Sequence, residues 1–537
     1  MRMVTKKLNE LIAILRIRRI WLILTSRMEN KDQYEVVVGL EVHAQLLTKS
    51  KLFCGDSISF GEEPNTHVSP VTLAHPGTLP KMNRKAIEMA VKMGLACQCE
   101  IVQQNYFARK NYFYPDLPKG YQVSQHTTPV CKAGSIKINI GNNEKKIRLN
   151  RIHLEEDAGK SLHDADPANT CIDLNRAGTP LIEIVSEPDL RSGEEAFIYL
   201  NEIRKLVRYL GICDGNMEEG SLRCDANISV RKKGETALGT RVEIKNLNSA
   251  RNVKRAIEAE SRQLIEILEQ GGAIIQQTKS FDAGSGSSFA IRDKEDADDY
   301  RYFPEPDLPP FHLQDEFIER VRKTIPELPE VRTRRYISSF NLSEYDALVI
   351  TEEKSFADYF EKIVSSLPSP SGVPELSEGK ERSSLGVRHK SGANWMLGPV
   401  KAWLNENNKE IGEFPLTASQ LVKLIGLVDT GKISFSSAST KLFGYLTKYP
   451  DADPEQSAKE MDLLQESDRL AILPIVDAVL EKFADKVMEY KKARPNGSSG
   501  RRKKGLLALF VGEVIKRSKG KADPKIVNEL LIEKLKL

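Results

Sequence analysis

Apolar and polar residues alternate along residues 36–46 (VVVGLEVHAQL), a pattern typical of a β-strand with one buried face. The apolar phase consists of Leu40, Val42, Ala44 and Leu46. The opposite phase carries Glu41 and His43, whose side chains project side by side in such a strand. A carboxylate and an imidazole placed in this way could share a metal ion. The alternative is an ordinary edge strand with a solvated polar face, and the motif taken alone favours that alternative.

Two further strands are predicted at residues 222–231 (LRCDANISVR) and 241–248 (RVEIKNLN). Their polar phases contain Arg223, Asp225, Asn227, Glu243 and Lys245. The loop between the strands contains two glycines, which indicates an antiparallel hairpin with an open face of mixed charge. A solvated face tolerates such residues. Together with Glu41 and His43, however, they also provide what phosphoryl transfer needs, which is carboxylates for Mg²⁺ and a cation for phosphate oxygens.

Carboxylates also accompany two other predicted strands. The apolar phase of residues 147–157 (IRLNRIHLEED) slips after Leu149, which predicts a β-bulge of the kind often found beside active sites. This strand ends in Glu155, Glu156 and Asp157. In the strand predicted within residues 175–189, Glu183 faces away from two flanking isoleucines. Of these carboxylates, Glu156 and Glu183 are the candidates to join Glu41 and His43.

Residues 109–122 (RKNYFYPDLPKGYQ) are aromatic and basic and are interrupted by Pro and Gly, which predicts a structured loop. One interpretation is that the aromatic rings pack the loop onto a sheet. The other is that Arg109, Lys110 and Lys119 give a polar, basic lining to a passage or to a site for an anionic substrate.

After residue 310 the apolar spacing changes from alternation to a helical period of three to four residues. The change predicts an α+β chain with a strand-rich domain at 34–310, a helical domain at 311–400 and a helical tail domain at 401–537. Residues 365–386 are rich in Ser, Pro, Gly and Glu and are expected to form a flexible insert.

The composition is that of a globular protein, with 40% hydrophobic and 29% charged residues among 537. Seven cysteines form no regular framework, which favours reduced thiols in a cytosolic compartment. Residues 1–33 are set apart as an N-terminal extension. Their apolar runs are too short to span a membrane. We favour a start-site extension, with Met28 as the natural start, over a transit peptide.

The C-terminal segment 486–537 holds 15 basic and 5 acidic residues, whereas residues 28–537 as a whole are slightly acidic. A basic helical tail on such a chain predicts contact with nucleic acid. The alternative is a tail that only improves solubility. The candidate contacts are Arg501, Arg502, Lys503, Lys504, Lys516, Arg517, Lys519 and Lys521.

The motifs belong to an ordered series that runs from about residue 34 to the end of the chain. The series consists of VGLEVHAQL at 38–46, RKNYFYPDLPKGYQ at 109–122, IHLEEDAGK at 152–160, NRAGTPLIEIVSEPD at 175–189, MEEGSLRCDANISVR at 217–231, GTRVEIKNLNS at 239–249, DYRYFPEPDLPP at 299–310 and FVGEVIKRSKGKADPKIVNELL at 510–531. It resembles the B subunit of the bacterial and organellar tRNA-dependent amidotransferases, and ordered matches of this length are highly specific.

The resemblance implies an ATP-dependent ligase that converts Glu-tRNA(Gln) to Gln-tRNA(Gln), Asp-tRNA(Asn) to Asn-tRNA(Asn), or both. ATP would phosphorylate the side-chain carboxylate, and ammonia would then displace the phosphate. The implied partners are the A subunit, a glutamine amidase that supplies ammonia through a channel, the small C subunit, and a non-discriminating aminoacyl-tRNA synthetase. The implied fold is a kinase-like cradle of antiparallel sheet, then a helical domain, then a helical tail that approaches tRNA. A bacterial cytoplasmic location is favoured over a mitochondrial one, and no membrane is involved.

The resemblance also implies roles for the candidate residues. The expected ligands of Mg²⁺ are Glu41, His43, Glu156 and Glu183, followed by Asp225. Because His is unusual for Mg²⁺, the site could also accept Mn²⁺. The remaining catalytic set is Arg223, Asn227, Glu243 and Lys245, which would hold ATP phosphates or a second metal, with Arg223 and Lys245 as the nucleotide contacts. Arg109, Lys110 and Lys119 would serve the channel or an interface between subunits.

One departure from the family pattern concerns zinc. Many members carry CxC followed by CPxC, whereas this chain has Cys54-Gly55-Asp56 and Ser69-Pro70-Val71-Thr72. Three of the four thiol ligands are therefore absent, and we expect no zinc. Two other functions are kept as alternatives. One is a metal-dependent hydrolase that processes RNA, and the other is a non-catalytic scaffold that binds tRNA.

Overall fold

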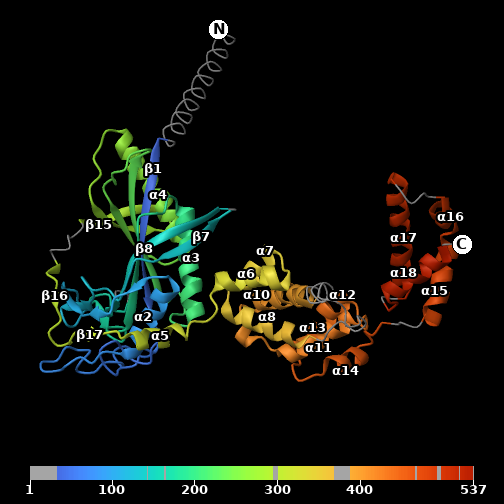
Figure 1. Ribbon diagram of the computed structural model, residues 1–537, viewed down its shortest axis with the longest axis horizontal. Helices are drawn as coiled ribbons and strands as arrows, with labels where there is room; N and C mark the ends of the chain where they lie inside the picture. Colours follow the sequence, from blue (N-terminus) through green and yellow to red (C-terminus); the bar gives the residue numbers. More distant parts are fainter. Residues whose placement is uncertain are drawn as a thin grey trace, which may run out of the picture. The chain divides into compact units, whose positions relative to one another are not determined.

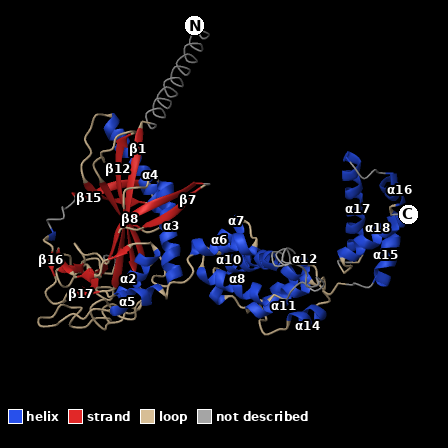
Figure 2. Ribbon diagram, in the orientation of Figure 1, coloured by secondary structure: helices blue, strands red, loops and turns tan. Residues whose placement is uncertain are grey.

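A computed structural model of the chain describes residues 33–141, 143–162, 165–293, 300–367, 388–465, 469–492, 497–518 and 521–535 (Figure 1). Almost all of the extension at 1–33 and of the insert at 365–386 lies outside these residues. The chain divides into two compact units, one ending at Leu328 and the other beginning at Pro329. In Figure 2 the strands lie in the first unit and the second is helical, so the α+β prediction is confirmed.

The first unit is built on a ten-stranded sheet. Its strands are β1 (Tyr34–Gln45), β2 (Glu100–Ile101), β6 (Cys131–Lys132), β7 (Ser135–Ile140), β8 (Asn143–Glu156), β11 (Pro180–Ser186), β12 (Leu222–Lys232), β13 (Val242–Leu247), β14 (Gln277–Asp282) and β15 (Ser287–Asp293). They follow the order β15-β14-β13-β12-β1-β11-β8-β6-β2, with β7 paired to β8. The pairs are antiparallel except β13 and β14, which helix α4 (Ala250–Glu269) connects in parallel.

Strand β1 lies in the middle of this sheet, and its alternation decides which face is covered. Val38, Leu40, Val42 and Ala44 have no exposed surface, as expected for the apolar phase. Their side belongs to the first hydrophobic core, to which helices α2 (Arg84–Ala96), α3 (Gly193–Leu210) and α4 contribute their buried residues. Burying this face leaves the opposite, polar face of the strands for a site.

The first unit also contains short strands outside the main sheet. They are β3 (Gln104–Asn105), β4 (Ala108–Asn111), β5 (Tyr121–Ser124), β9 (Lys160–Leu162), β10 (Cys171–Asp173), β16 (Phe303–Pro304) and β17 (Phe311–His312). Strand β16 pairs with β4 and β17 pairs with β3, so the chain returns to its N-terminal part before helix α5 (Asp315–Arg322). The first unit continues past residue 310, because Ile318 and Val321 of α5 are buried in its core.

The second unit contains two separate hydrophobic cores. The first core is built from helices α6 (Pro329–Phe340), α7 (Glu344–Ile350), α8 (Lys354–Ser366), α10 (Lys401–Asn407), α11 (Ala418–Asp429), α12 (Phe435–Ser437), α13 (Phe443–Leu446) and α14 (Pro454–Glu460), with short turns η2 (Met396–Val400), η3 (Ile411–Glu413) and η4 (Ala438–Leu442). Met396 and Leu404 share this core, so residues on both sides of 400 pack together.

The second of these cores belongs to the C-terminal helices α15 (Arg469–Lys482), α16 (Ala484–Lys492), α17 (Gly497–Arg517) and α18 (Pro524–Leu535). Val476, Phe510 and Val527 are fully buried in it, so these helices form a small bundle. Within the described residues, no helix has the length and apolar character that crossing a membrane requires.

Candidate active site

The register of four neighbouring strands brings polar residues from distant parts of the chain together. On β1, His43 lies opposite Glu183 of β11, and Glu41 lies opposite Asp225 of β12. Beyond β11, His153 of β8 lies opposite Glu183. Opposite residues on neighbouring strands share a face of the sheet, so these side chains gather on the polar face.

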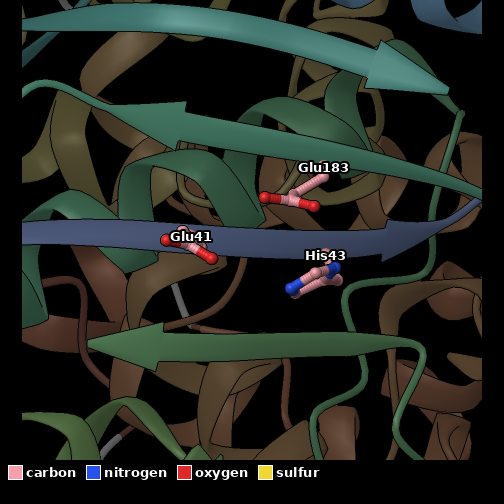
Figure 3. A group of neighbouring side chains, drawn as sticks. All are labelled: Glu41, His43 and Glu183. Atoms are coloured by element: carbon pink, nitrogen blue, oxygen red, sulfur yellow. The ribbon is translucent and has the colours of Figure 1, made fainter. Parts of the chain in front are cut away.

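Two overlapping groups of possible metal ligands occur on this face in the described part of the chain. Glu41, His43 and Glu183 each place one ligand atom within 4.8 Å of the other two (Figure 3). Figure 3 shows Glu41 and His43 along one strand and Glu183 on the strand beside it. The second group is His153, Glu155 and Glu183, which meets the same limit and shares Glu183.

Close contacts between imidazoles and carboxylates join the two groups. His43 Nδ1 lies 3.4 Å from Glu155 Oε1, and His153 Nε2 lies 3.3 Å from Glu183 Oε2 and 3.6 Å from Glu155 Oε2. Burial alone would lower the pKa of His153, but Glu183 and Glu155 raise it to about 9. Burial alone would raise the pKa of Glu183, but His153 and His43 lower it to about 2. The site therefore carries internal ion pairs.

Glu41 lies where negative charge accumulates. Burial raises the pKa of its carboxyl group, and the neighbouring carboxylates of Glu183, Glu243 and Asp225 raise it further. Asn227 Nδ2 donates a hydrogen bond of 2.8 Å to Glu41 Oε1. A cation at this position would therefore favour the ionised form of Glu41.

Two basic side chains from β12 and β13 flank the carboxylates. Lys245 Nζ lies 2.9 Å from Asp225 Oδ2 and 3.5 Å from Glu243 Oε1. One terminal nitrogen of Arg223 donates at 2.8 Å to Asp157 Oδ2, and Asp157 is buried. All five residues predicted on β12 and β13 thus surround Glu41 and His43, whereas the sequence pattern predicted no role for Asp157.

A cavity of about 750 Å³ opens over this face. Its lining includes both groups of possible metal ligands, together with Arg223, Asp225, Glu243 and Lys245. Lys110, Arg151 and the rings of Tyr112, Tyr300 and Tyr302 form other parts of the wall. A cavity of this size with a few convergent polar groups is typical of a small-molecule site.

Glu156, an expected metal ligand, is not in either group. Its carboxylate accepts hydrogen bonds from Lys119 Nζ and from the backbone N–H of Val123, beside a second and much smaller cavity. Its neighbour Glu155 lies in the main cavity, because adjacent residues of a strand point to opposite faces. The sequence contained this signal, since Ile152 and Leu154 mark the apolar phase and leave His153 and Glu155 on the other.

The three basic residues expected to line a channel have different surroundings. Arg109 forms two hydrogen bonds of 2.7 Å with the buried carboxylate of Glu305 and stacks 4.2 Å from the ring of Tyr121. Lys119 is paired with Glu156. Lys110 lines the main cavity. Arg109 and Lys119 therefore have partners within the chain, and Lys110 is the one that reaches the main cavity.

The predicted nucleic-acid contacts lie on and around α17. Lys504, Lys516 and Arg517 are exposed there. Arg502 pairs with Glu489, Lys503 Nζ lies 4.7 Å from the centre of the Tyr490 ring, and Lys521 pairs with Asp462. Lys519 and the side chain of Arg501 lie outside the described residues.

The segments that replace the zinc motif also come together. Asp56 Oδ2 accepts hydrogen bonds from the Ser69 N–H and from Thr72 Oγ1, and Cys54 Sγ lies 3.3 Å from the same oxygen. A carboxylate thus connects the two loops. The expectation that no zinc binds here stays a prediction.

Comparison with known proteins agrees with the series of motifs. The family described as the GatB/GatE catalytic domain matches residues 36–319, and the family described as the GatB domain matches residues 381–535. The chain is 47% identical over 506 residues to the aspartyl/glutamyl-tRNA(Asn/Gln) amidotransferase B subunit of Geobacter sp. (strain M21), a match that covers 94% of this chain and 99% of that protein. The protein of the same name from Thermodesulfovibrio yellowstonii is 46% identical over 504 residues, or 94% of this chain and 100% of that protein. The chain belongs to the family of B subunits of the aspartyl/glutamyl-tRNA(Asn/Gln) amidotransferases.

Proposed function

We propose that this chain phosphorylates the side-chain carboxylate of a misacylated tRNA within a glutamine-hydrolysing amidotransferase and supports amidation of the product. The substrate is Glu-tRNA(Gln), Asp-tRNA(Asn) or both. The observation that carries the proposal is the convergence of Glu41, His43 and Glu183 inside the cavity of about 750 Å³. The relatives' shared name supplies the reaction class.

The proposed reaction has two steps because a carboxylate is a poor electrophile. In the first step a side-chain carboxylate oxygen attacks the γ-phosphorus of ATP, an acyl phosphate forms, and ADP leaves. In the second step ammonia attacks the carbonyl carbon, the C–O bond to phosphate breaks, and the nitrogen loses a proton. The products are the side-chain amide and inorganic phosphate, with the original carboxylate oxygen carried away on the phosphate.

The donor set of the site fits a divalent cation. Carboxylate oxygens are the usual ligands of Mg²⁺, and the imidazole of His43 also suits Mn²⁺. Glu41, His43 and Glu183 would hold the ion, with Asp225 and Glu155 beside them. The accumulated negative charge that raises the pKa of Glu41 supports this assignment. A bound cation would offset the charge of two anions, the triphosphate and the substrate carboxylate, as they approach.

The chain's own cations would orient the phosphates. Asp225 and Glu243 hold Lys245, and Asp157 holds one terminal nitrogen of Arg223, so both side chains are positioned before a nucleotide binds. Preorganised donors of this kind lose little entropy when phosphate arrives. Asn227 would keep the Glu41 carboxylate oriented through their hydrogen bond.

The proposal includes partners for the second step. The A subunit, a glutamine amidase, would supply ammonia, and the small C subunit would support the assembly. Of the three residues expected to serve the channel, Lys110 is the one that lines the main cavity, where the ammonia path would end. Arg109 and Lys119 are assigned to holding the cavity wall through Glu305 and Glu156. A non-discriminating aminoacyl-tRNA synthetase would provide the misacylated tRNA in a bacterial cytoplasm.

The tail bundle is proposed to bind tRNA. The exposed cations Lys504, Lys516 and Arg517 can contact phosphates without first breaking an ion pair that the described residues form. The proposal needs only electrostatic contact, because phosphate contacts position a nucleic acid without reading its sequence.

The test uses the full chain co-expressed and purified with its amidase and small subunits. The complex receives Mg²⁺, ATP, glutamine and Glu-tRNA(Gln) or Asp-tRNA(Asn), each labelled in the amino acid. We expect ADP release that requires aminoacyl-tRNA, and labelled glutamine or asparagine after deacylation. Omitting glutamine and ammonia should stop amidation while tRNA-dependent ADP release continues.

A matched pair of variants separates the alternatives. Glu183→Gln should abolish tRNA-dependent ADP release, whereas Glu187→Gln, on the same segment but bonded to Asn150 outside the cavity, should retain it. Cleavage of tRNA without release of ADP would instead identify an RNA-processing hydrolase. If Glu183→Gln supports full activity in the complex, the chain is a scaffold and the site assignment is wrong.

A further inference from the structure

The basic side chains that line the main cavity differ in whether they have an anionic partner. Arg223 and Lys245 are in ion pairs. Lys110, Arg151 and Lys160 form no ion pair and no side-chain hydrogen bond with any described residue. Arg151 Nε is buried without a hydrogen-bond partner. Because an unsatisfied buried donor is costly, Arg151 is a candidate to bind a ligand.

Aromatic rings lie beside the unpaired cation Lys110 and line the same cavity as Arg151. Lys110 Nζ lies 4.7 Å from the centre of the Tyr300 ring and 5.7 Å from that of Tyr112. The rings of His126 and Tyr302 are stacked, with centres 4.1 Å apart and planes 13° from parallel. These rings line the same cavity as Arg151. This end therefore combines unpaired positive charge with flat apolar surfaces.

In this part of the cavity, one side chain is neutral and offers a stacking surface, and another is charged and can bind an anion. Burial lowers the pKa of His126, and the nearby charge of Arg151 lowers it further, so the imidazole is neutral at neutral pH and offers a stacking surface. Burial alone would lower the pKa of Lys110, but Tyr302, Glu155 and Glu183 raise it, so Lys110 is a cation. A nucleotide can stack its base on one group and place its phosphate on the other.

Distance along the strand indicates which nucleotide this is. Arg151 and His153 share a face of β8 and are separated by about 7 Å, so the unpaired arginine is close to the metal-ligand groups. In an aminoacyl-tRNA, about five bonds, or roughly 6 Å, separate the ester oxygen on the terminal ribose from the side-chain carboxyl carbon. The terminal adenosine must therefore lie beside the reacting carboxylate. The adenine of ATP is farther from its γ-phosphorus, with three phosphates and a ribose between them.

We propose that Arg151, Lys110 and the His126–Tyr302 ring pair form a subsite for the 3′-terminal adenosine nucleotide of the aminoacyl-tRNA. Its base extends the ring stack, and its 5′-phosphate binds Arg151 and Lys110. The subsite directs the esterified side chain toward Glu41, His43 and Glu183. This inference rests on the proposed function, since it assumes that the substrate is an aminoacyl-tRNA.

The test compares tRNA that ends in CCA with tRNA from which the terminal adenosine has been removed. Filter binding with the full chain in its complex measures both dissociation constants, and calorimetry measures binding of Mg²⁺ with a non-hydrolysable ATP analogue. We expect wild type to prefer the complete tRNA by about tenfold. Arg151→Gln and Tyr302→Leu should reduce that preference to near unity and raise the KM for Glu-tRNA(Gln), without changing affinity for the ATP analogue. Arg151→Lys should restore part of the preference because it keeps the charge.

Arg148→Gln is the matched control. Arg148 is on the same strand, but it is exposed and paired with Asp189 outside the cavity, so its removal should leave the preference intact. If Arg151→Gln lowers the affinity for the ATP analogue and leaves the preference for complete tRNA unchanged, the subsite binds ATP and the proposal is wrong. Unchanged binding of both ligands also overturns it. Formation of ADP by wild type tests the proposed function separately, because that reaction can succeed when the subsite assignment fails.

Discussion

Replacing Asp157 by Asn tests whether the site depends on a carboxylate that the sequence pattern did not single out. Asp157 is 4% exposed and accepts a 2.8 Å bond from Arg223 and a 2.7 Å bond from Gln45 Nε2. Breaking a fully buried ion pair costs about 3–5 kcal/mol. The side chain of Arg223 is 35% exposed, and Asn can still accept one bond, so we expect a loss of about 2–3 kcal/mol from the first unit.

The loss should appear in calorimetry as a lower melting temperature of the first unit. For domains of this order of size, 1 kcal/mol corresponds to about 2–4 °C, so Asp157→Asn should melt about 5–10 °C lower at neutral pH. Asp189→Asn is the control, because its partner Arg148 is exposed and ion pairs at the surface contribute little to stability. The affinity for ATP should also fall, because Arg223 loses the partner that orients it.

The pH dependence gives this prediction its sign. Burial opposes ionisation of Asp157, but Arg223 and Arg176 outweigh it and lower the pKa of the carboxyl group. The stabilisation from ionised Asp157 is therefore complete above the pKa of about 3.9 that Asp has in the unfolded chain. It is lost as the pH falls through the lower pKa that Asp157 has in the folded protein. The gap between wild type and Asp157→Asn should narrow below about pH 4. A gap under about 1 °C at neutral pH, or one that widens in acid, would refute the reasoning.

Three other predictions concern the site and the tail. Glu155→Gln should lower the kcat of tRNA-dependent ADP release by about 100-fold or more, whereas Glu156→Gln should affect stability more than kcat. The reason is that the two carboxylates lie on opposite faces of β8. Equal losses of kcat would contradict this placement. Chelation by EDTA should abolish ADP release, and adding Mg²⁺ or Mn²⁺ should restore it. Electron paramagnetic resonance should show that Glu183→Ala binds Mn²⁺ at least about tenfold more weakly than wild type. Deleting residues 486–537 should weaken tRNA binding and flatten its dependence on salt, as measured by filter binding, and an unchanged salt slope would exclude the tail as a phosphate-binding surface.

The strand pattern predicted much of the first unit because a period of two decides which side chains share a face. It placed Glu41 and His43 on the face opposite Leu40 and Val42, and the structure confirms both assignments. The same rule separates Glu155 from Glu156, because Ile152 and Leu154 mark the apolar phase of β8. The structure accordingly places Glu155 in the main cavity and Glu156 beside the smaller one, and the role of Glu156 as a metal ligand stays a prediction.

The sequence by itself determined the family, the α+β composition and the polar face that carries the candidate ligands, because these depend on local order and periodicity. Tertiary structure decided which polar residues meet. Strand register sets Glu183 between His43 and His153, and folding supplies Asp157 as the partner of Arg223. Among the described residues, it also leaves Arg151 without an ion-pair partner beside rings contributed from residues 126 and 302. Pairing between residues this far apart in the sequence depends on hydrogen bonds between strands and on competition among charges, and no local pattern contains either.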